Sequence, residues 1–583
     1  MTRRPPRVRA GVAATATLAA LATAACAQGP LVSSRATPGG PASTGGPSTG
    51  SASPTGGTST DTPAPAPVPG NTSRSGRAGA TLPARQAPTA GLQRYYSQRL
   101  TWRACGTTVR CADLTVPLDY GDLARGTITI ALNRQPATGS GAALGDLVVN
   151  PGGPGGSGLQ YALAAPQILT PGVRARYAVV GFDPRGVGQS TPVSCLDTAG
   201  LDAFVDADPT PSTAAEVAQV AAAGRSMADG CARESARILP YLGTVQTDGD
   251  LDVLRAALDQ PRLTYLGKSY GTYIGSTYAD RFPARVGRFV LDGAVDPSLD
   301  SDALDLGQAR GFQTALTAFL TDWISAGTCP LGSTPAAAQA RLQALLAPLE
   351  AHPLALGGSR PLTLGEAVNG VLYPLYSKQS WSTLRVALTT FARGDGTGLQ
   401  LISDADTGRG PSGYQDNGIA AFWATSCLDR PATDTDARIR SQLPAFQQAS
   451  PVFGLALAWG SLPCRYWHVP STSAPHQVHA PGTPPILVVG TTRDPATPYV
   501  WARSLAAQLD SGVFLGRVGD GHTGYVEGNS CVDTRVDTYL LTGRAPADGT
   551  VCPDPAGVEA PGTAGSAAPG PAASPAAVAL TWG

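Results

Sequence analysis

Short apolar segments alternate with amphipathic segments along much of the chain. Residues 177–182, 263–266 and 286–291 are short runs of mainly apolar, β-branched and aromatic residues, which is typical of buried strands. Residues 244–258 and 272–281 instead repeat their apolar positions every three or four residues, as amphipathic helices do. This alternation predicts an α/β fold, in which helices cover both faces of a mostly parallel sheet.

The same pattern predicts further elements before and after this region. Additional strands are expected at 111–120, 127–134, 146–150, 484–490 and 512–518, with a helix at 499–509. Between about 298 and 480 the alternation stops, and Ala- and Leu-rich helical segments such as 336–349 take its place. We therefore expect a helical lid at 298–480, inserted between two parts of one core at 92–297 and 481–552.

Both ends of the chain differ from this core. Residues 28–91 and 553–583 are rich in Gly, Pro, Ser, Thr and Ala, and they hold too few large apolar residues to offset the entropy of folding. We expect both segments to be disordered. Residues 1–27 combine four early arginines with an apolar run from Ala10 to Ala25, which is the pattern of a secretory signal.

Two processing sites compete at the end of that signal. Ala25-Cys26-Ala27 fits ordinary signal cleavage, whereas Thr23-Ala24-Ala25-Cys26 resembles a bacterial lipobox. Thr23 stands where a lipobox usually has Leu. The sequence leaves open whether Cys26 is lipidated and anchors the protein to a membrane, but both alternatives predict a secreted or envelope-anchored, extracytoplasmic protein.

The composition indicates which binding partners and which redox state of the cysteines to expect. The formal net charge is zero and 14% of residues are charged, which gives no basis for nucleic-acid binding. An exported chain makes disulfides expected among the nine cysteines after Cys26. Local pairs are plausible for Cys105–Cys111, Cys195–Cys231, Cys427–Cys464 and Cys531–Cys552, which leaves Cys329. No Cys/His spacing indicates zinc, and we expect no metal, no cofactor and a monomer.

The chain is organised around the motif Gly267-Lys268-Ser269-Tyr270-Gly271. It matches Gly-x-Ser-x-Gly, and it lies between a predicted strand and a predicted helix. In this context the motif is the nucleophile elbow of α/β-hydrolases, whose sharp turn exposes the serine hydroxyl above the sheet. The alternative is an ordinary turn serine, since the chain is rich in Gly and Ser.

A glycine-rich turn follows the strand at 146–150. The run Pro151–Gly158 can direct backbone N–H groups into a cavity without obstruction by side chains, as an oxyanion hole requires. The alternative is a phosphate-binding loop. The run lacks a Gly-Lys-Ser/Thr ending, and it lacks a Gly-x-Gly-x-x-Gly motif with an acidic ribose ligand.

Ser269, Asp494 and His522 occur in the chain order of an α/β-hydrolase triad, and each follows a predicted strand. His522 would take the serine proton, and a carboxylate would hold the imidazole tautomer. Asp292, at the end of the strand after the elbow, is the alternative acid. Asp520 is expected to shape the turn before His522.

A further pair of charged residues lies in the loop that begins at Asp183. Asp183 and Arg185 are expected to pair with each other and to brace the loops around the site, and a direct role in catalysis is the alternative.

Together these motifs resemble the secreted tripeptidyl aminopeptidases, which are α/β-hydrolase serine peptidases related to prolyl aminopeptidases. The resemblance rests on Asn-Pro-Gly-Gly-Pro-Gly, Asp-Pro-Arg-Gly-x-Gly-x-Ser, Gly-Lys-Ser-Tyr-Gly-Thr, Leu-Asp-Gly and Arg-Asp-Pro-x-Thr-Pro, and it runs from about 102 to 552. It implies a Ser269, Asp494, His522 triad and an oxyanion hole formed by the N–H groups of Gly153 and Tyr270. Ile324 stands where the family often has Cys, which leaves Cys329 without a partner.

The resemblance implies hydrolysis of peptides from free N-termini, with release of short peptides such as tripeptides. An esterase or lipase on the same fold is the alternative enzyme, and a binding protein on an inactive hydrolase scaffold is the alternative outside enzymes. An exopeptidase needs a carboxylate for the substrate ammonium. Asp429, beside Cys427 in the lid, is the candidate, and a solvated lid charge or a helix cap is the competing interpretation.

Overall fold

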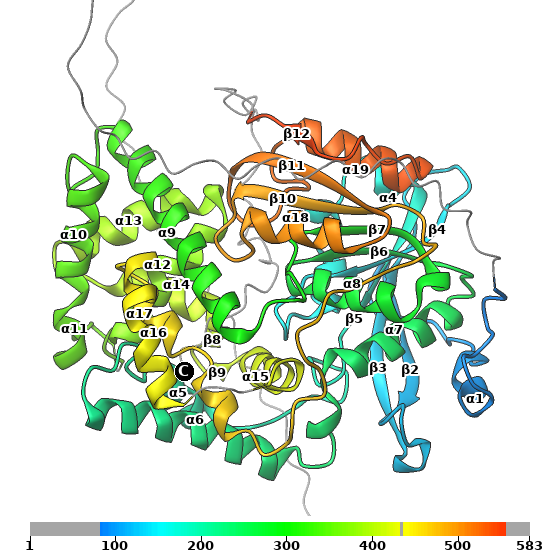
Figure 1. The fold of residues 1–583 in the computed structure, drawn as a ribbon, viewed down its shortest axis with the longest axis horizontal. Coiled ribbons are helices and arrows are strands. Elements are labelled where there is room, and N and C mark those ends of the chain that lie inside the picture. The colour runs from blue at the N-terminus through cyan, green and yellow to red at the C-terminus, as the bar shows by residue number, and fades with distance from the viewer. Residues whose placement is uncertain (1–81, 359, 432–434, 555–583) are drawn as a thin grey trace, which may run out of the picture. The chain divides into compact units, whose positions relative to one another are not determined.

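A ten-stranded sheet runs through the described part of the chain (Figure 1). The computed structural model describes residues 82–358, 360–431 and 435–554, which belong to a compact unit assigned to Thr72–Gly583. The other unit, Met1–Asn71, lies outside the described residues, as do the predicted signal and Cys26. The strands are β1 Arg103–Ala104, β2 Arg110–Pro117, β3 Thr127–Gln135, β4 Gly145–Asn150, β5 Tyr177–Phe182, β6 Leu263–Lys268, β7 Val286–Asp292, β10 Ile486–Arg493, β11 Gly512–Asp520 and β12 Thr550–Cys552.

The strand order is β1-β2-β3-β5-β4-β6-β7-β10-β11-β12. Strands β1 to β3 are antiparallel to their neighbours, and every pair from β5–β4 to β11–β12 is parallel. The prediction of a mostly parallel sheet is confirmed. Because parallel strands end at one edge, the loops after β4, β6, β7, β10 and β11 all emerge on the same side.

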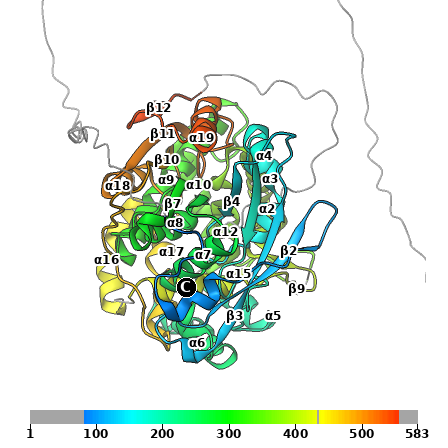
Figure 2. The same cartoon turned by 90° about the vertical axis from the view of Figure 1, so that its right-hand side faces the viewer.

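Each central strand is apolar on both faces, because helices cover both. Val148 packs in the cluster formed with α7 and α8, and its neighbour Val149 packs in the cluster on the opposite face. Figure 2 shows these two helical layers with the sheet between them. One layer contains α7 Thr244–Ala257, α8 Tyr270–Arg281 and α18 Tyr499–Gln508; the other contains α2 Gly158–Leu163, α3 Ala165–Ile168, α4 Pro171–Arg176 and α19 Ser530–Thr542.

The segment between β7 and β10 is helical and has a core of its own. We call residues 298–480 the lid, and Phe312, Leu316 and Leu388 are fully buried members of its core. Two very short strands, β8 Arg409–Gly410 and β9 Gly413–Tyr414, pair within it. Its helices are α9 Ser301–Ser325, α10 Pro335–Leu346, α11 Pro348–Ala351, α12 Leu364–Leu372, α13 Trp381–Phe391, α14 Thr397–Thr407, α15 Gly418–Asp429, α16 Asp436–Ala449 and α17 Gly454–Ala458.

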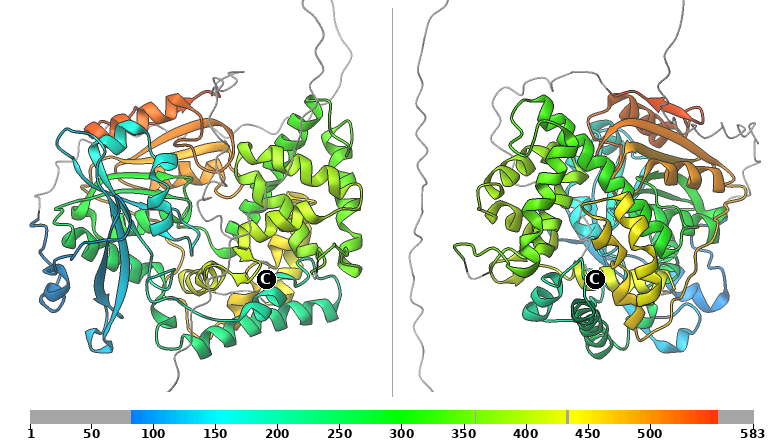
Figure 3. Two further views of the ribbon diagram at one scale, coloured as in Figure 1. Left: turned by 180° about the vertical axis from the view of Figure 1, so that it is seen from behind. Right: turned by 60° about the vertical axis from the view of Figure 1, so that its left-hand side comes forward.

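A second helical insertion, which the sequence pattern did not predict, packs against the lid. Helices α5 Thr198–Val205 and α6 Ala214–Glu234 lie between β5 and α7 in the chain. Val217 and Val220 of α6 share a small core with Trp459 of the lid. Asp202 of α5 pairs with Arg409, with Nε and carboxylate oxygen 2.7 Å apart. Figure 3 shows α6 running beneath the lid helices.

Order begins earlier than the composition predicted. Residues 82–91, assigned to the disordered linker, are described and held by the core, with Arg285 Nη1 donating to the carbonyl of Pro83 at 2.9 Å and Arg255 Nη1 to that of Ala84 at 2.7 Å. They precede a short helix, α1 Gln93–Tyr96. Two buried arginines thus fix a segment that has little apolar surface. At the other end, Asn529 donates to the carbonyl of Pro553 at 2.8 Å.

The four expected disulfides are confirmed. Cys105–Cys111, Cys195–Cys231, Cys427–Cys464 and Cys531–Cys552 are bonded, and Cys329 is a free thiol. The second bond ties the loop after β5 to α6, and the third joins α15 to a later lid turn. None of the helices in the described ranges combines the length and apolar character that crossing a membrane requires.

Candidate active site

Ser269 occupies a strained turn between β6 and α8. Its φ of +55° lies in a region that residues with a side chain rarely adopt, and its N–H donates to the carbonyl of Asp292 at 3.0 Å. A Cβ added to Gly267 would lie 2.3 Å from the carbonyl oxygen of Gly271, so the two glycines allow strand and helix to pass at close range. This is the geometry of a nucleophile elbow.

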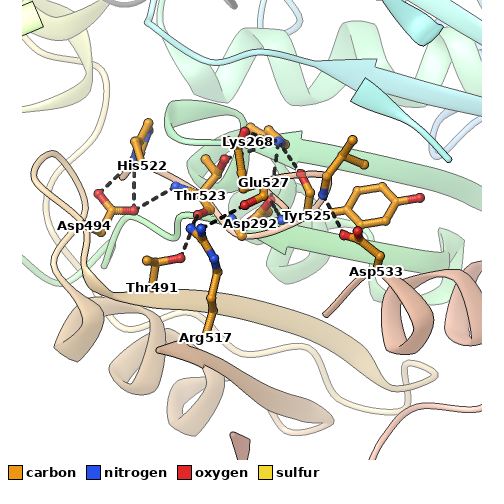
Figure 4. Close-up of polar contacts among 12 residues, drawn as sticks. Lys268, Asp292, Thr491, Asp494, Arg517, His522, Thr523, Tyr525, Glu527 and Asp533 are labelled. Carbon is orange, nitrogen blue, oxygen red and sulfur yellow. Dashed lines mark hydrogen bonds and ion pairs between the residues drawn. The ribbon is translucent and has the colours of Figure 1, made fainter. Parts of the chain in front are cut away.

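His522 and Asp494 meet at the same edge of the sheet. Asp494 follows β10 and His522 follows β11, and the His522 Nδ1 atom lies 2.8 and 3.0 Å from the two Asp494 oxygens. The carboxylate also accepts the backbone N–H groups of Ala496, Thr497 and Thr523 at 2.8–3.0 Å. Figure 4 shows Asp494 between His522 and Thr523. These N–H donors fix the orientation of the carboxylate relative to the His522 ring.

The contacts of His522 suit it for proton transfer. Because Nδ1 faces a carboxylate, the proton of the neutral ring belongs on Nδ1, and Nε2 is then an acceptor. Nε2 is buried and has no hydrogen-bond partner among the described residues. Tyr376 of the lid also contacts this histidine. The backbone N–H of His522 donates to the carbonyl of Tyr376 at 2.7 Å, and the two side-chain rings meet edge to face.

Asp292, the alternative acid, makes no hydrogen bond to the His522 ring. Its carboxylate accepts the N–H groups of Gly524 and Tyr525 at 2.7 and 3.0 Å, and the Lys268 ammonium lies 3.7 Å away. Burial raises the pKa of Asp292, whereas Lys268 and these two donors lower it. Asp292 therefore supports the loop that carries His522.

Lys268 completes this support from inside the elbow. Its ammonium donates to the Tyr525 carbonyl at 2.9 Å and the Thr523 hydroxyl at 3.2 Å, and lies 3.6 Å from Glu527 (Figure 4). Burial lowers the pKa of Lys268, but the Tyr161 hydroxyl and the carboxylates around it outweigh burial, so the net shift is upward. A charged lysine thus links the nucleophile strand to the histidine loop.

Gly153 and Tyr270 line the same cavity as Ser269. The adjacent Gly152 has a φ of +93°, and a Cβ there would lie 2.5 Å from the Lys268 carbonyl oxygen and 2.7 Å from the Tyr270 nitrogen. The glycine-rich turn therefore comes close to the first residue of α8, where helical N–H groups have no intrahelical acceptor. This is the location that the predicted oxyanion hole requires.

The lid contributes residues to the wall of this cavity, which has a volume of about 150 Å³. Apolar side chains make up much of the wall, including Leu304, Trp423 and Leu457 from the lid. Within the described ranges the charged residues of the lining are Asp305 of α9 and Arg430, which follows α15.

Asp429 is not part of the cavity lining, in contrast to the sequence hypothesis. It is fully buried, and its oxygens accept the Thr244 N–H at 2.7 Å, the Thr244 hydroxyl at 2.6 Å and the Tyr270 hydroxyl at 3.0 Å. Burial raises the pKa of Asp429, and the bonds from Thr244 lower it. Asp429 thus caps the first turn of α7 from the lid, which matches the competing interpretation as a helix cap.

The predicted pairing of Asp183 with Arg185 is wrong, although both residues brace the site. Arg185 makes a buried bidentate pair with Asp250 at 2.6 and 2.8 Å. Asp183 accepts the Ser157 hydroxyl at 2.6 Å and the N–H of Gln189 at 2.8 Å, so it connects two loops.

Asp520 holds the turn before His522 through ion pairs. It pairs with Arg493, and one of its oxygens lies 3.2 Å from the Lys378 ammonium.

Comparison with known proteins identifies the family. The sequence model of the TAP-like proteins matches residues 450–552. Serine protease Hip1 of Mycobacterium tuberculosis is 39% identical over 459 residues, which cover 76% of this chain and 87% of Hip1. The chain belongs to the TAP-like family. Tripeptidyl aminopeptidase of Streptomyces lividans is 34% identical, covering 81% of this chain and 89% of its own, and Carboxylesterase B of M. tuberculosis is 35% identical, covering 76% and 86%.

Several residues of this TAP-like site were not found from sequence. Thr497 donates to Asp494 at 3.1 Å and its hydroxyl lies 3.2 Å from His522 Nδ1. The position of Thr497 three residues after Asp494, in the same loop, could have indicated that its hydroxyl contacts the Asp494 carboxylate. Tyr376, Asp305 and Arg430 come from distant lid segments, and no local pattern marks them.

Proposed function

We propose that this TAP-like protein is a serine exopeptidase that cleaves short peptides from free N-termini through an acyl-enzyme. The observation that carries the proposal is the Asp494–His522 hydrogen bond, which occurs at the sheet edge that presents Ser269 on its elbow. Lid residues line the same cavity, which suits an enzyme that must limit the length of chain bound on one side of the scissile bond.

The reaction follows from the roles of these groups. His522 Nε2 takes the proton of Ser269 Oγ as the oxygen attacks the scissile carbonyl, and the N–H groups of Gly153 and Tyr270 stabilise the resulting oxyanion. His522 then returns the proton to the leaving amine, which breaks the C–N bond and leaves an ester on Ser269. Water, deprotonated by His522, hydrolyses that ester, and Asp494 stabilises the imidazolium in both halves.

Asp305 replaces Asp429 as the proposed partner of the substrate ammonium. It is the carboxylate of the cavity lining within the described residues, and an ammonium removed from water needs a charged partner. Four disulfides support an extracytoplasmic location. Lipidation of Cys26 remains a proposal from the sequence.

A panel of matched substrates tests the function. Tripeptide p-nitroanilides with free and acetylated N-termini are compared with short-chain p-nitrophenyl esters, since a 35% identical relative is named Carboxylesterase B. Acetylation should lower kcat/KM by about a hundredfold, on the order of 3 kcal/mol. Asp305→Asn should remove most of this discrimination. Equal rates on free and acetylated peptides, or efficient hydrolysis of esters alone, would contradict the exopeptidase assignment.

A further inference from the structure

Arg430 brings a positive charge to the wall of the Ser269 cavity. It follows the last turn of α15, directly after Asp429, and it lines the cavity together with Ser269 and Asp305. The Cys427–Cys464 disulfide fixes this end of α15, and Cys464 itself lines the cavity. The arginine is therefore presented from a covalently restrained part of the lid.

The guanidinium of Arg430 has hydrogen-bond acceptors within the fold for only some of its N–H groups. Nε donates to the Leu299 carbonyl at a long 3.4 Å, and the guanidinium lies 5.1 Å from the centre of the Tyr273 ring. Nη2 is buried and has no hydrogen-bond partner among the described residues. A buried guanidinium N–H without an acceptor is costly, so its presence in the wall of the Ser269 cavity calls for a partner that comes with the substrate.

Neighbouring acids do not fill this role through hydrogen bonds. Asp429 is adjacent in sequence and the charge of Arg430 lowers its pKa, but its oxygens accept hydrogen bonds from Thr244 and Tyr270 and not from the guanidinium. No ion pair within 4.0 Å joins Arg430 to a carboxylate in the part of the chain that the structure describes. Arginine prefers carboxylates, which its planar donor array matches, and the largely apolar cavity wall strengthens such a pair.

We infer that Arg430 binds a carboxylate of the substrate, so that the enzyme prefers peptides carrying an acidic group near the scissile bond. The inference rests on the proposed peptidase function and adds the substrate class. The carboxylate can belong to an Asp or Glu side chain or to the free C-terminus of a short peptide, and both supply the same two oxygens. Asp305 would then bind the ammonium of a peptide while Arg430 binds a carboxylate of the same peptide.

Matched substrates distinguish these sources. Free-amine tripeptide p-nitroanilides carry Glu or Gln at the first, second or third residue, and tetrapeptides end in a free acid or an amide. The wild type should prefer the charged member of at least one pair by about ten- to hundredfold in kcat/KM. Arg430→Gln should abolish that preference, because it should slow the charged member of the pair far more than the neutral member. Arg430→Lys should retain part of it.

Arg393→Gln is the matched control, because Arg393 is an exposed lid arginine outside the cavity lining. A purely structural role for Arg430 would lower the rates on charged and neutral substrates alike. Equal wild-type rates within every pair, or a preference that survives Arg430→Gln, would overturn the inference.

A second readout does not depend on peptide hydrolysis. The Glu and Gln tripeptide amides are compared for protection of Ser269 against a fluorophosphonate. Stronger protection by Glu in the wild type but not in Arg430→Gln supports the inference even if the peptidase assignment fails, and equal protection in the wild type contradicts it.

Discussion

Two carboxylates at the ends of neighbouring strands have different tasks, and exchanging each for an amide separates them. Asp494 contacts the His522 ring, whereas Asp292 accepts the N–H groups of Gly524 and Tyr525. Asp494→Asn places an amide opposite Nδ1 and favours the wrong histidine tautomer, with the proton on Nε2. In another serine protease the equivalent change lowers kcat about ten-thousandfold, or roughly 5 kcal/mol, and we expect a similar loss here.

Asp292→Asn should mainly affect stability. One of the two buried N–H groups would face an amide –NH₂, at a cost of about 1–3 kcal/mol. Lys268 would lose its partner at 3.7 Å but would keep Glu527 at 3.6 Å and the Tyr525 carbonyl at 2.9 Å. We therefore expect a clearly lowered Tm and a loss in kcat of no more than about thirtyfold, roughly 2 kcal/mol.

The assay measures kcat/KM on a free-amine tripeptide p-nitroanilide together with thermal unfolding of each variant. Asp520→Asn is the control, because Asp520 ends β11 two residues before His522 and pairs with Arg493 and Lys378 instead of the histidine. The reverse ranking, with both variants folded, would move the catalytic acid to Asp292. Equal losses of activity would refute the division of tasks.

Three further outcomes follow from other parts of the structure. Asp429→Asn should slow the hydrolysis of free-amine and acetylated substrates by a similar factor, because Asp429 holds Tyr270 and α7. A selective loss of the preference for free amines in kcat/KM would instead indicate that Asp429 binds the substrate ammonium. Intact mass after alkylation of the oxidised protein should show four disulfides and one modified thiol at Cys329, and a fully reduced active enzyme would contradict this. Burial raises the pKa of Asp406 to about 7, so the folded state holds a proton that the unfolded state releases near pH 4. This contribution to stability is present below about pH 4 and falls until about pH 7, so Asp406→Asn should gain Tm relative to wild type as pH rises across that window. A constant Tm difference across the window would contradict that titration.

The parallel core was predictable because its signals are local. A strand such as β5, Tyr177–Phe182, is a continuous apolar run, and the elbow at Ser269 is a short motif in a strand–turn–helix context. The chain order of Ser269, Asp494 and His522 predicted the triad, because parallel strands end at one edge of the sheet and place the residues that follow them near one another.

The lid contacts were not predictable in the same way. Asp429 was assigned to the cavity from its position beside Cys427, but the side-chain direction depends on how α15 packs on α7, which no local pattern encodes. Arg185 likewise pairs with Asp250, sixty-five residues away, instead of its near neighbour Asp183. Charged residues in loops choose partners by tertiary geometry, and sequence spacing gives little information on that choice.

The most direct test of the central claim is the mass of the covalent adduct formed with a tripeptide diphenyl phosphonate. We expect one adduct on the peptide that contains Ser269, rapid labelling with a free N-terminus, and labelling slowed by about a hundredfold after acetylation of the reagent. Ser269→Ala should show no adduct while remaining folded. Undiminished labelling of Ser269→Ala, or equal labelling by the free and acetylated reagents, would contradict the account.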